Sequence, residues 1–366
     1  MLTRFEPYGR ILMGVNLKDL IPPTCRQEID DLRVLSRKII ALDVYNALYQ
    51  FLAAIRQPDG TPLMDSKGNI TSHLSGLFYR TINLVENGIK PVYVFDGKPP
   101  ELKHEELERR RIRKEKAAEL MVKAYSEGEV KEAAKYAVQA IHLTDPMVKE
   151  AKRLLEAMGI PYVQALGEGE AQAAYLAKKS LAWATGSQDY DSLLFGTPRL
   201  VRNLTITGKR KLPGKDVYVE VKVELIELDK LLKTLGITLE QLIDIGILIG
   251  TDYNPDGVEG VGPKTALQLV KTYGSLEKAL RVLPKAKFPE DPMKIREYFL
   301  KSPVVDLDKI EWKEPDRDAV IQILVKDHDF SLDRVENALK RLEKAYRDFI
   351  KGSPASLDQW FKFSKK

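Results

Sequence analysis

The chain of 366 residues contains one cysteine, Cys25, and only four histidines. A single cysteine excludes an intramolecular disulfide and a cysteine-based zinc or iron–sulfur site. The histidines are scattered along the chain, and none makes a metal-ligand spacing with another. The chain also lacks a signal peptide and any apolar run long enough to span a bilayer. We therefore expect an intracellular protein with no membrane partner.

What the sequence does contain is an alternation of short apolar segments and amphipathic ones. Hydrophobic residues make up 44% and charged residues 30% of the chain, which is typical of a globular protein. The segments predicted to be strands are 38–43, 89–97, 160–165, 180–189, 198–204 and 216–226. Helical periodicity is found in 44–56, 73–88, 170–179 and most of the chain beyond 238. This order predicts an α/β fold with a central, mostly parallel sheet flanked by helices.

Seven acidic residues stand at the boundaries of these segments. They are Asp43, Asp96, Glu168, Glu170, Asp189, Asp191 and Asp252. Asp43, Asp96 and Asp189 fall at or near the carboxyl ends of expected strands, where open α/β sheets bind their ligands. The pairs 168/170 and 189/191 have apolar flanks and no lysine or arginine beside them. Each pair is expected at an element boundary, where both side chains can point the same way.

Clustered carboxylates without cationic partners repel one another, and burial increases the cost. A divalent cation removes both costs, and an all-oxygen ligand set selects a hard ion such as Mg²⁺ or Mn²⁺. Seven carboxylates are too many for one such ion. They predict two ions roughly 4 Å apart, which activate water and stabilise the leaving oxygen of a phosphodiester. The alternatives are helix caps with surface acids, and a carboxylate pair for glycoside hydrolysis, which needs only two acids.

Two further segments have features suited to phosphate groups. Residues 98 to about 141 form a highly charged helical segment that contains "RRRIRKEK" and directly follows Asp96. This segment is either a solvated helix with Glu–Lys pairs or a positively charged arch that follows a phosphate backbone. In "GVEGVGPKTALQL", Gly260 and Gly262 precede a helix that carries Lys264. That stretch is either a simple turn or a phosphate-binding helix N-terminus of helix-hairpin-helix type.

Five motif blocks together resemble the flap endonuclease family, most closely its archaeal form. They are "FDGKPPELK", "GEGEAQAAYL", "SQDYDSLLFG", "RLVRNLT" and "GTDYNPDGVEGVGPKTAL". The resemblance implies a structure-specific 5′ nuclease that depends on Mg²⁺, with Mn²⁺ as an alternative. The expected substrate is branched DNA with a 5′ flap, cut by endonuclease and 5′–3′ exonuclease activity in Okazaki-fragment maturation and long-patch base excision repair. Such a protein is expected to be monomeric, and cytoplasmic in an archaeal cell.

The resemblance also implies roles for individual residues. The seven carboxylates would hold the metal ions. Lys103 and Arg110, seven positions apart on one helix face, would be catalytic by stabilising charge on the scissile phosphate. Arg113 and Lys114 match gateway positions beside them, and Tyr49 matches an aromatic residue that stacks on a base, although helix packing would also explain Tyr49. Positions near a 3′-flap pocket and the approach to the site are matched by Arg56, Thr71 and Arg80.

Both ends of the chain depart from the family pattern. Family members usually begin Met-Gly-Val, which here starts at Met13, so residues 1–12 are expected to be disordered or not native. The tail "SPASLDQWFKF" resembles a motif that binds a sliding clamp of the proliferating cell nuclear antigen type, with Pro354 at the usual Gln position. The clamp-binding side chains would be Leu357, Trp360 and Phe361. The alternative is that these side chains fold back on the protein.

We therefore expect a nuclease domain over 13–351, between the 1–12 extension and a clamp-binding tail over 352–366. Its parts would be an N-terminal part (14–97), the helical arch (98–146), an internal part (147–250), a helix-hairpin-helix element (251–285) and C-terminal helices (286–351). Two other functions stay open. One is a nuclease of the same superfamily that prefers gaps, bubbles or nicked duplex. The other is a non-catalytic DNA-junction binder or clamp adaptor, which loss of an acid would favour, but all seven are present.

Overall fold

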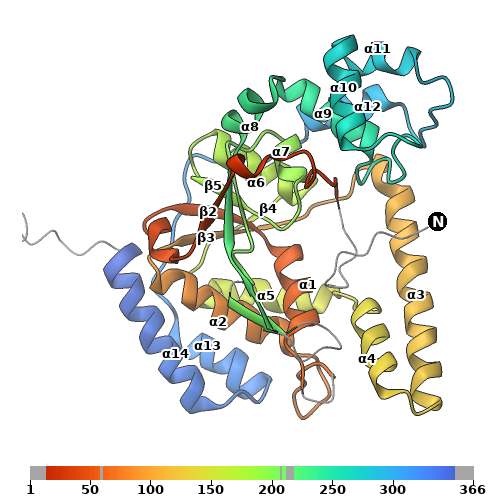
Figure 1. Cartoon of the computed structure of the whole chain (residues 1–366). Coiled ribbons are helices and arrows are strands. Elements are labelled where there is room, and N and C mark those ends of the chain that lie inside the picture. The colour runs from red at the N-terminus through yellow and green to blue at the C-terminus, as the bar shows by residue number, and fades with distance from the viewer. Residues whose placement is uncertain (1–13, 58–60, 207, 212–217, 351–366) are drawn as a thin grey trace, which may run out of the picture.

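Seven strands form one mixed sheet at the centre of the computed structural model (Figure 1). The structure describes residues 14–57, 61–206, 208–211 and 218–350. In spatial order the strands are β1 (Arg26–Ile29), β9 (Val223–Glu227), β6 (Arg199–Arg202), β5 (Ala184–Gly186), β2 (Ile39–Asp43), β3 (Lys90–Phe95) and β4 (Tyr162–Gln164). All pairs from β6 to β4 are parallel, whereas β9 is antiparallel to both β6 and β1. This arrangement confirms the predicted α/β fold with a mostly parallel sheet.

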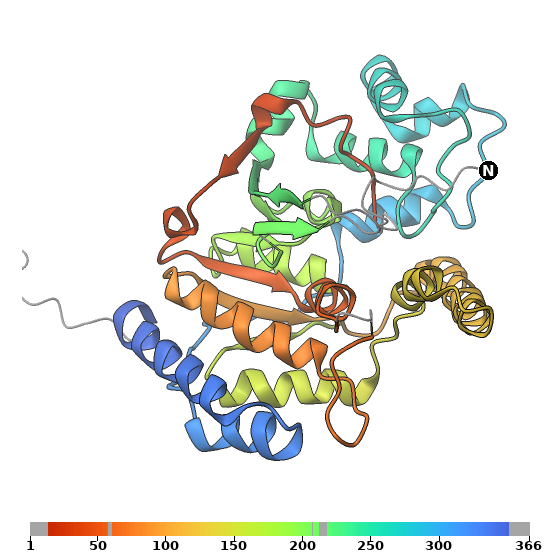
Figure 2. The ribbon, with the colours of Figure 1, turned by 60° about the horizontal axis from the view of Figure 1, so that its bottom comes forward.

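Helices lie on both sides of the sheet (Figure 2). One side contains α1 (Val44–Ala54), α2 (Ser72–Glu86), α5 (Asp145–Ala157), α13 (Arg317–Ile321) and α14 (Leu332–Ala345). The other side contains α6 (Gly169–Lys178), α7 (Asp191–Leu194), α8 (Leu228–Leu235) and α9 (Leu239–Ile249). Helical spacing explains this packing: in α2, Leu74, Leu77 and Phe78 recur on one face and are fully buried. An apolar core on each side therefore holds the strands, and with them the strand ends, in place.

Two helices, α3 (His104–Ser126) and α4 (Val130–Gln139), stand beside this body and form an arch (Figure 1). Along α3, the buried residues are Glu106, Ala117 and Ala124. A helix with so little apolar surface cannot pack a whole face on the sheet. The small alanines, together with Ala133 of α4, are buried within the helix pair instead. The charged helical arch expected from the sequence is thus confirmed as an element of the fold.

A second helical group extends from α9. It consists of α10 (Pro263–Tyr273), α11 (Leu276–Arg281) and α12 (Pro292–Leu300). The buried Asp244 of α9 accepts hydrogen bonds from the Leu276 N–H at 3.0 Å and from Arg296 Nε at 2.7 Å, which ties α11 and α12 to α9. The turn between α9 and α10 is the predicted helix-hairpin-helix connection. Among the described residues, no helix is both long and apolar enough to cross a membrane.

The stretch predicted as one strand over 216–226 is divided, and that prediction is wrong. β8 (Tyr218–Val221) pairs with β7 (Gly208–Lys211) in a separate two-stranded hairpin, while β9 joins the main sheet. Lys222 lies between β8 and β9, and its ammonium group contacts Glu28 of β1 and Asp30 just after it, each at 3.0 Å. The alternation of apolar residues continues through both strands, so periodicity alone does not reveal the break.

Candidate active site

Three neighbouring parallel strands, β5, β2 and β3, bring acidic side chains together at their carboxyl ends. Asp43 is the last residue of β2, Asp96 follows β3 and Asp189 follows β5. The start of α6, the start of α7 and the turn after α9 supply the other four, Glu168, Glu170, Asp191 and Asp252. Each of the seven is near enough to another for their charges to interact. The structure therefore gathers the seven predicted residues into one carboxylate cluster.

Burial and mutual repulsion raise the pKa of most carboxyl groups in the cluster. Burial is the larger cause for Asp43 and Asp96, and together with neighbouring carboxylates it raises the pKa of each to about 7. The pKa of Asp189 rises to about 6 for the same two reasons. Burial, followed by nearby acids, also holds the pKa of Glu170 and Asp191 well above the usual range. Much of the cluster therefore lacks compensating positive charge.

Neutral donors orient several of these carboxylates. The side-chain amide of Asn46 donates to Asp189 Oδ2 at 2.8 Å. The hydroxyl groups of Ser187 and Ser192 both donate to Glu170 Oε1, at 2.8 and 3.2 Å. No sequence motif marks these donors. The available signal was their position, because the serines flank the 189/191 acid pair and Asn46 lies in the first turn of the helix that follows Asp43.

The first described residues of the chain also contact the cluster. The Gly14 N–H donates to Asp252 Oδ1 at 3.0 Å, and the Val15 N–H donates to Asp191 Oδ1 at 2.6 Å. Gly14 has a φ of 80°, and a Cβ at this position would lie 2.5 Å from Asp191 Oδ2. Glycine is therefore required here for the chain to pass so close to the acids. The predicted extension, residues 1–12, lies outside the described residues.

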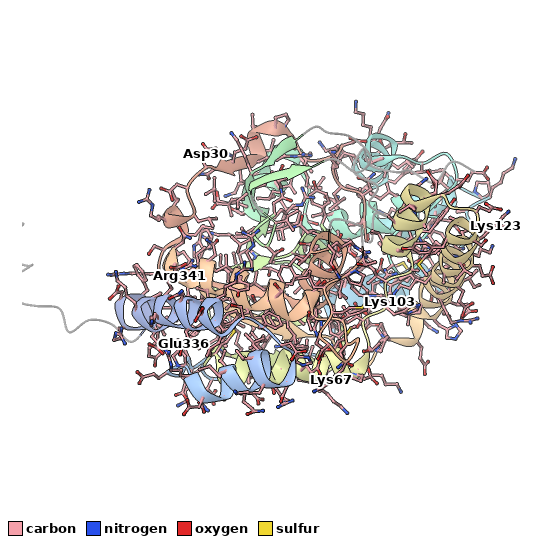
Figure 3. The ribbon with its side chains drawn as sticks, turned by 90° about the horizontal axis from the view of Figure 1, so that it is seen from below. Asp30, Lys67, Lys103, Lys123, Glu336 and Arg341 are labelled. Atoms are coloured by element: carbon pink, nitrogen blue, oxygen red, sulfur yellow. The ribbon has the colours of Figure 1, made fainter. Side chains whose placement is uncertain are left out.

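Two cations from the arch reach the other end of the cluster. Lys103 Nζ lies 2.6 Å from Glu168 Oε2 and 3.0 Å from Asp252 Oδ2, and Arg110 Nη2 lies 2.7 Å from the same Asp252 oxygen. Burial favours a higher pKa for Asp252, but the charges of Lys103 and Arg110 outweigh it and lower this pKa to about 2. Figure 3 shows Lys103 on the side of the arch that faces the body, whereas Lys123 lies on its outer side. In the sequence no lysine or arginine stands beside the 168/170 and 189/191 acid pairs. In the fold, Lys103 and Arg110 bring positive charge to the cluster from a distant part of the chain.

The donor set of the cluster fits hard divalent cations, because all seven candidate ligands are carboxylates. The acids whose hydrogen bonds come from neutral donors are those whose pKa is raised, so a cation bound beside them would stabilise their ionised forms. As the side chains stand, no three acidic, histidine or cysteine groups among the described residues converge closely enough to hold a metal ion. The fit of this site to a cation thus rests on the chemistry of its carboxylates.

Three of the residues predicted to contact DNA lie where α3 faces α1. Lys114 Nζ lies 3.1 Å from the Tyr49 hydroxyl oxygen and 4.7 Å from the centroid of its ring. Arg113 donates to Glu106 Oε1 at 2.9 Å within the arch helix. The structure thus brings Tyr49 and Lys114 together, while their role in binding DNA stays a prediction.

The remaining predicted residues lie on other elements. Arg56 and Thr71 belong to the connection between α1 and α2, where Arg56 forms a β-bridge with Pro62, and Arg80 lies within α2. Gly260 and Gly262 lie in the turn that leads into α10, and Lys264 lies in the first turn of that helix. The predicted clamp-binding side chains, Leu357, Trp360 and Phe361, lie outside the described residues.

The chain is similar to proteins of known families and structures. The families described as XPG N-terminal domain and XPG I-region match residues 13–117 and 159–252. "Flap endonuclease 1" of Hyperthermus butylicus is 64% identical over 350 residues, which cover 96% of this chain and 100% of the relative. The solved structure of flap endonuclease-1 from Methanococcus jannaschii is 46% identical with a TM-score of 0.70, covering 91% of this chain and 98% of that one. The catalytic core of Rad2 in complex with DNA substrate is 25% identical with a TM-score of 0.65, covering 90% and 100%.

Proposed function

The chain belongs to the flap endonuclease family, nucleases that hydrolyse phosphodiester bonds of DNA, and we propose that its carboxylate cluster is the site of cleavage. The observation that carries this proposal is the contact between the two sides of the site. Three strand ends, the starts of α6 and α7 and the turn after α9 provide the seven carboxylates. On the other side, Lys103 and Arg110 contact two of these carboxylates, Glu168 and Asp252. Such a site can hold cations and a phosphate group at once, which is the requirement for hydrolysing a phosphodiester.

The ions expected in this site are two Mg²⁺, with Mn²⁺ as an alternative, held by the seven carboxylates. When bound, such a pair activates water and stabilises the leaving oxygen of an in-line displacement. Asp43 and Asp96, whose pKa values are about 7 without a cation, give up their protons as the site is loaded. Asn46 and the two serines keep their acceptor carboxylates oriented while this happens.

Lys103 and Arg110 act on the substrate in this proposal. Both already point into the cluster, so a phosphate that enters the site meets their charges next to the carboxylates. Each then exchanges a carboxylate partner for the scissile phosphate, whose growing negative charge it stabilises. Lys114 and Tyr49 lie nearby at the inner side of the arch, where the aromatic ring can stack on a base beside the cut.

Branched DNA with a 5′ flap is the proposed substrate. The Rad2 core, whose fold matches over 90% of this chain, was solved with a DNA substrate, which supports DNA binding by the same fold here. The N-terminus of α10, with Gly260, Gly262 and Lys264, provides free N–H groups and a charge for a backbone phosphate. We assign Arg56, Thr71 and Arg80 to contacts with the DNA near the point where the flap leaves the duplex.

A cleavage assay on a labelled 5′-flap substrate tests this function. We expect cleavage in Mg²⁺ and none in excess EDTA. The same duplex without a flap, a gapped duplex and a bubble serve as controls and should be cut more slowly. Cleavage that persists in EDTA would contradict the metal-dependent site. A preference for gaps or bubbles would instead identify a nuclease of the same superfamily with another substrate.

The tail is proposed to bind a sliding clamp of the proliferating cell nuclear antigen type. Its aromatic residues are anchors suited to a hydrophobic pocket, and Pro354 removes the side-chain amide that Gln would offer. Deleting residues 353–366 should leave flap cleavage intact and remove stimulation by the matching clamp. Trp360→Ala with Phe361→Ala should have the same effect. Undiminished clamp binding by the double variant, measured by calorimetry, would contradict this assignment. Sedimentation of the enzyme without clamp tests the expected monomer.

A further inference from the structure

Two adjacent arginines of α3 contact one turn of the body. Arg110 contacts Asp252, as described above, and its neighbour Arg109 contacts Asp256 four residues later in the same turn. Figure 1 shows this end of α3 next to the group formed by α9 to α12. The turn 251–257 therefore carries a proposed metal ligand and also an attachment point for the arch.

The contact between Arg109 and Asp256 has the geometry of a specific pair. Arg109 Nη1 lies 2.9 Å from Asp256 Oδ1, and Nη2 lies 2.6 Å from Oδ2. The same guanidinium donates to Glu105 Oε1, one helical turn earlier, at 2.5 Å. Two parallel hydrogen bonds fix both the distance and the orientation of the partners. The pair therefore sets the position of the first turns of α3 more tightly than a single ion pair can.

The turn that carries Asp256 is itself held rigidly. The Thr251 hydroxyl donates to Asn254 Oδ1 at 2.7 Å, and Asn254 Nδ2 donates to the Ile247 carbonyl at 2.6 Å. Gly257 has a φ of 59°, and a Cβ there would lie 2.5 Å from the carbonyl carbon of Ile249. Asp256 thus projects from a turn that is packed against the end of α9, and this turn is a firm anchor.

The Arg109–Asp256 contact differs from the contacts of Lys103 and Arg110 with the cluster in whether it persists during the reaction. In the proposed function, Lys103 and Arg110 leave their carboxylates for the substrate, and the attachment that they provide is then lost. Neither Arg109 nor Asp256 is among the proposed ligands or phosphate-binding groups, so their contact can persist. Some persistent contact is needed to keep Lys103 and Arg110 over the reacting phosphate, because small displacements of a catalytic group are costly.

We propose that Arg109 and Asp256 are positioning residues that hold the first turns of the arch helix over the carboxylate cluster while Lys103 and Arg110 bind the substrate. This inference rests on the proposed function. The Arg109 side chain is 37% exposed and that of Asp256 is 75% exposed. Exposed ion pairs contribute little to global stability. The contact therefore acts locally on the placement of α3, and its loss should not unfold the protein.

The test compares Arg109→Gln, Asp256→Asn and the double variant with the wild-type enzyme. Arg111→Gln is the matched control, because Arg111 lies two positions after Arg109 on the same helix but contacts Glu108 and Glu115 of that helix. Hydrogen exchange of residues 104–116 is measured without DNA. Single-turnover cleavage of a 5′ flap and substrate affinity in Ca²⁺ are measured separately. Calorimetry should give the same unfolding temperature for all variants.

We expect both single variants, but not Arg111→Gln, to exchange faster over 104–116 and to cleave about tenfold more slowly, with little change in affinity. The double variant should be no worse than either single variant, because both act through one contact. Losses that multiply in the double variant would overturn the proposal. So would a defect in Arg109→Gln alone, which would make Arg109 a phosphate-binding residue. The exchange measurement needs no cleavage, so it tests the contact even if wild-type enzyme fails to cut flaps.

Discussion

The seven carboxyl groups of the cluster do not share one protonation state. Asp252 faces Lys103 and Arg110, and its pKa is lowered to about 2 against the effect of burial. For Asp43 and Asp96, burial has the largest effect on the pKa, which is raised to about 7 in each. At neutral pH the cluster therefore has one firmly ionised end beneath the arch and another end that retains protons. Divalent cations that bind the protonated end must displace those protons.

We expect Asp96→Ala and Asp189→Ala each to lower single-turnover cleavage of a 5′ flap by at least about 10²-fold, the scale on which loss of a transition-state-stabilising group acts. Both side chains are proposed metal ligands, whereas duplex DNA is held by basic and backbone groups. Substrate affinity, measured by fluorescence anisotropy in Ca²⁺, should change far less. Cleavage near the wild-type rate in Mg²⁺ by either variant would contradict their assignment as metal ligands.

We expect Lys103→Ala and Arg110→Ala each to lower single-turnover cleavage by at least about tenfold, because each removes a charge aimed at the transition state. Both cations reach the carboxylates in the structure. Arg111→Ala, which removes a charge from the same helix but not from the site, is the control and should cleave normally. Equal losses in binding and turnover would instead indicate that the arch grips DNA electrostatically.

The sequence predicted the acids of the site better than the groups that orient them. Carboxylates at segment boundaries are visible because strand ends can be located from apolar periodicity. The Gly14 N–H and Asn46 contacts to these acids are formed by residues distant in the chain, so no local pattern encodes them. The same is true of Arg109, whose partner lies 147 positions away. Such pairs follow only from the packed fold.

At the scale of elements, the connection between α1 and α2 depends on a residue from the C-terminal part of the chain. Its Asp65 is buried and accepts from the backbone N–H groups of Lys67 and Asn69, at 3.0 and 2.8 Å. His328 directly follows a π-helical turn, Gln322–Asp327. Its Nδ1 lies 3.0 Å from Asp65 Oδ2, and its Nε2 lies 3.3 Å from Glu150 Oε1. Burial favours a higher pKa for Asp65, but hydrogen bonds from Asn69 and His328 outweigh it and hold the pKa well below the usual range. Through its contacts with Asp65 and Glu150, His328 thus joins the α1–α2 connection, α5 and the π-helical turn.

We expect His328→Ala to increase hydrogen exchange over residues 61–71 severalfold, because that segment loses the side chain that ties it to α5 and the π-helical turn. The cores beneath it, and cleavage chemistry, should be nearly unaffected. Arg341→Ala is the matched control, since Arg341 pairs with Glu86 on the exposed side of the same layer. Exchange over 61–71 that is equal in the two variants would show that His328 does not hold this connection.

At the scale of the whole molecule, the fold buries negative charge in a protein whose formal net charge is +5. The two apolar cores on either side of the sheet keep the strand ends fixed and so keep the acids close together. This closeness disfavours the folded state whenever the acids are ionised without a cation. The stability of the whole chain is therefore linked both to pH and to divalent ions.

We expect the ion-free protein to unfold at a temperature at least a few degrees lower at pH 8 than at pH 5.5, and Ca²⁺ to raise that temperature more at pH 8. The pKa of Asp43 and of Asp96 is about 7 in the fold, against about 4 in an unfolded chain. Between these values the native state binds more protons, so stability from the protonated acids is fully present below about pH 4 and is lost as pH rises through about 7. Asp252, with its pKa of about 2, stays ionised throughout this window and does not contribute to the change.

Calorimetry in EDTA and in saturating Ca²⁺ at both pH values measures this linkage. The control is the double variant Asp43→Asn with Asp96→Asn, in which each amide oxygen can still accept the backbone hydrogen bonds from Asn46 and Gly169. Because this variant has fewer protons to lose, its ion-free unfolding temperature should depend less on pH, and Ca²⁺ should stabilise it less. An equal pH dependence in wild type and double variant would mean that these acids are not the source of the linkage. A Ca²⁺ effect that does not grow with pH would show that ion binding does not compete with their protons.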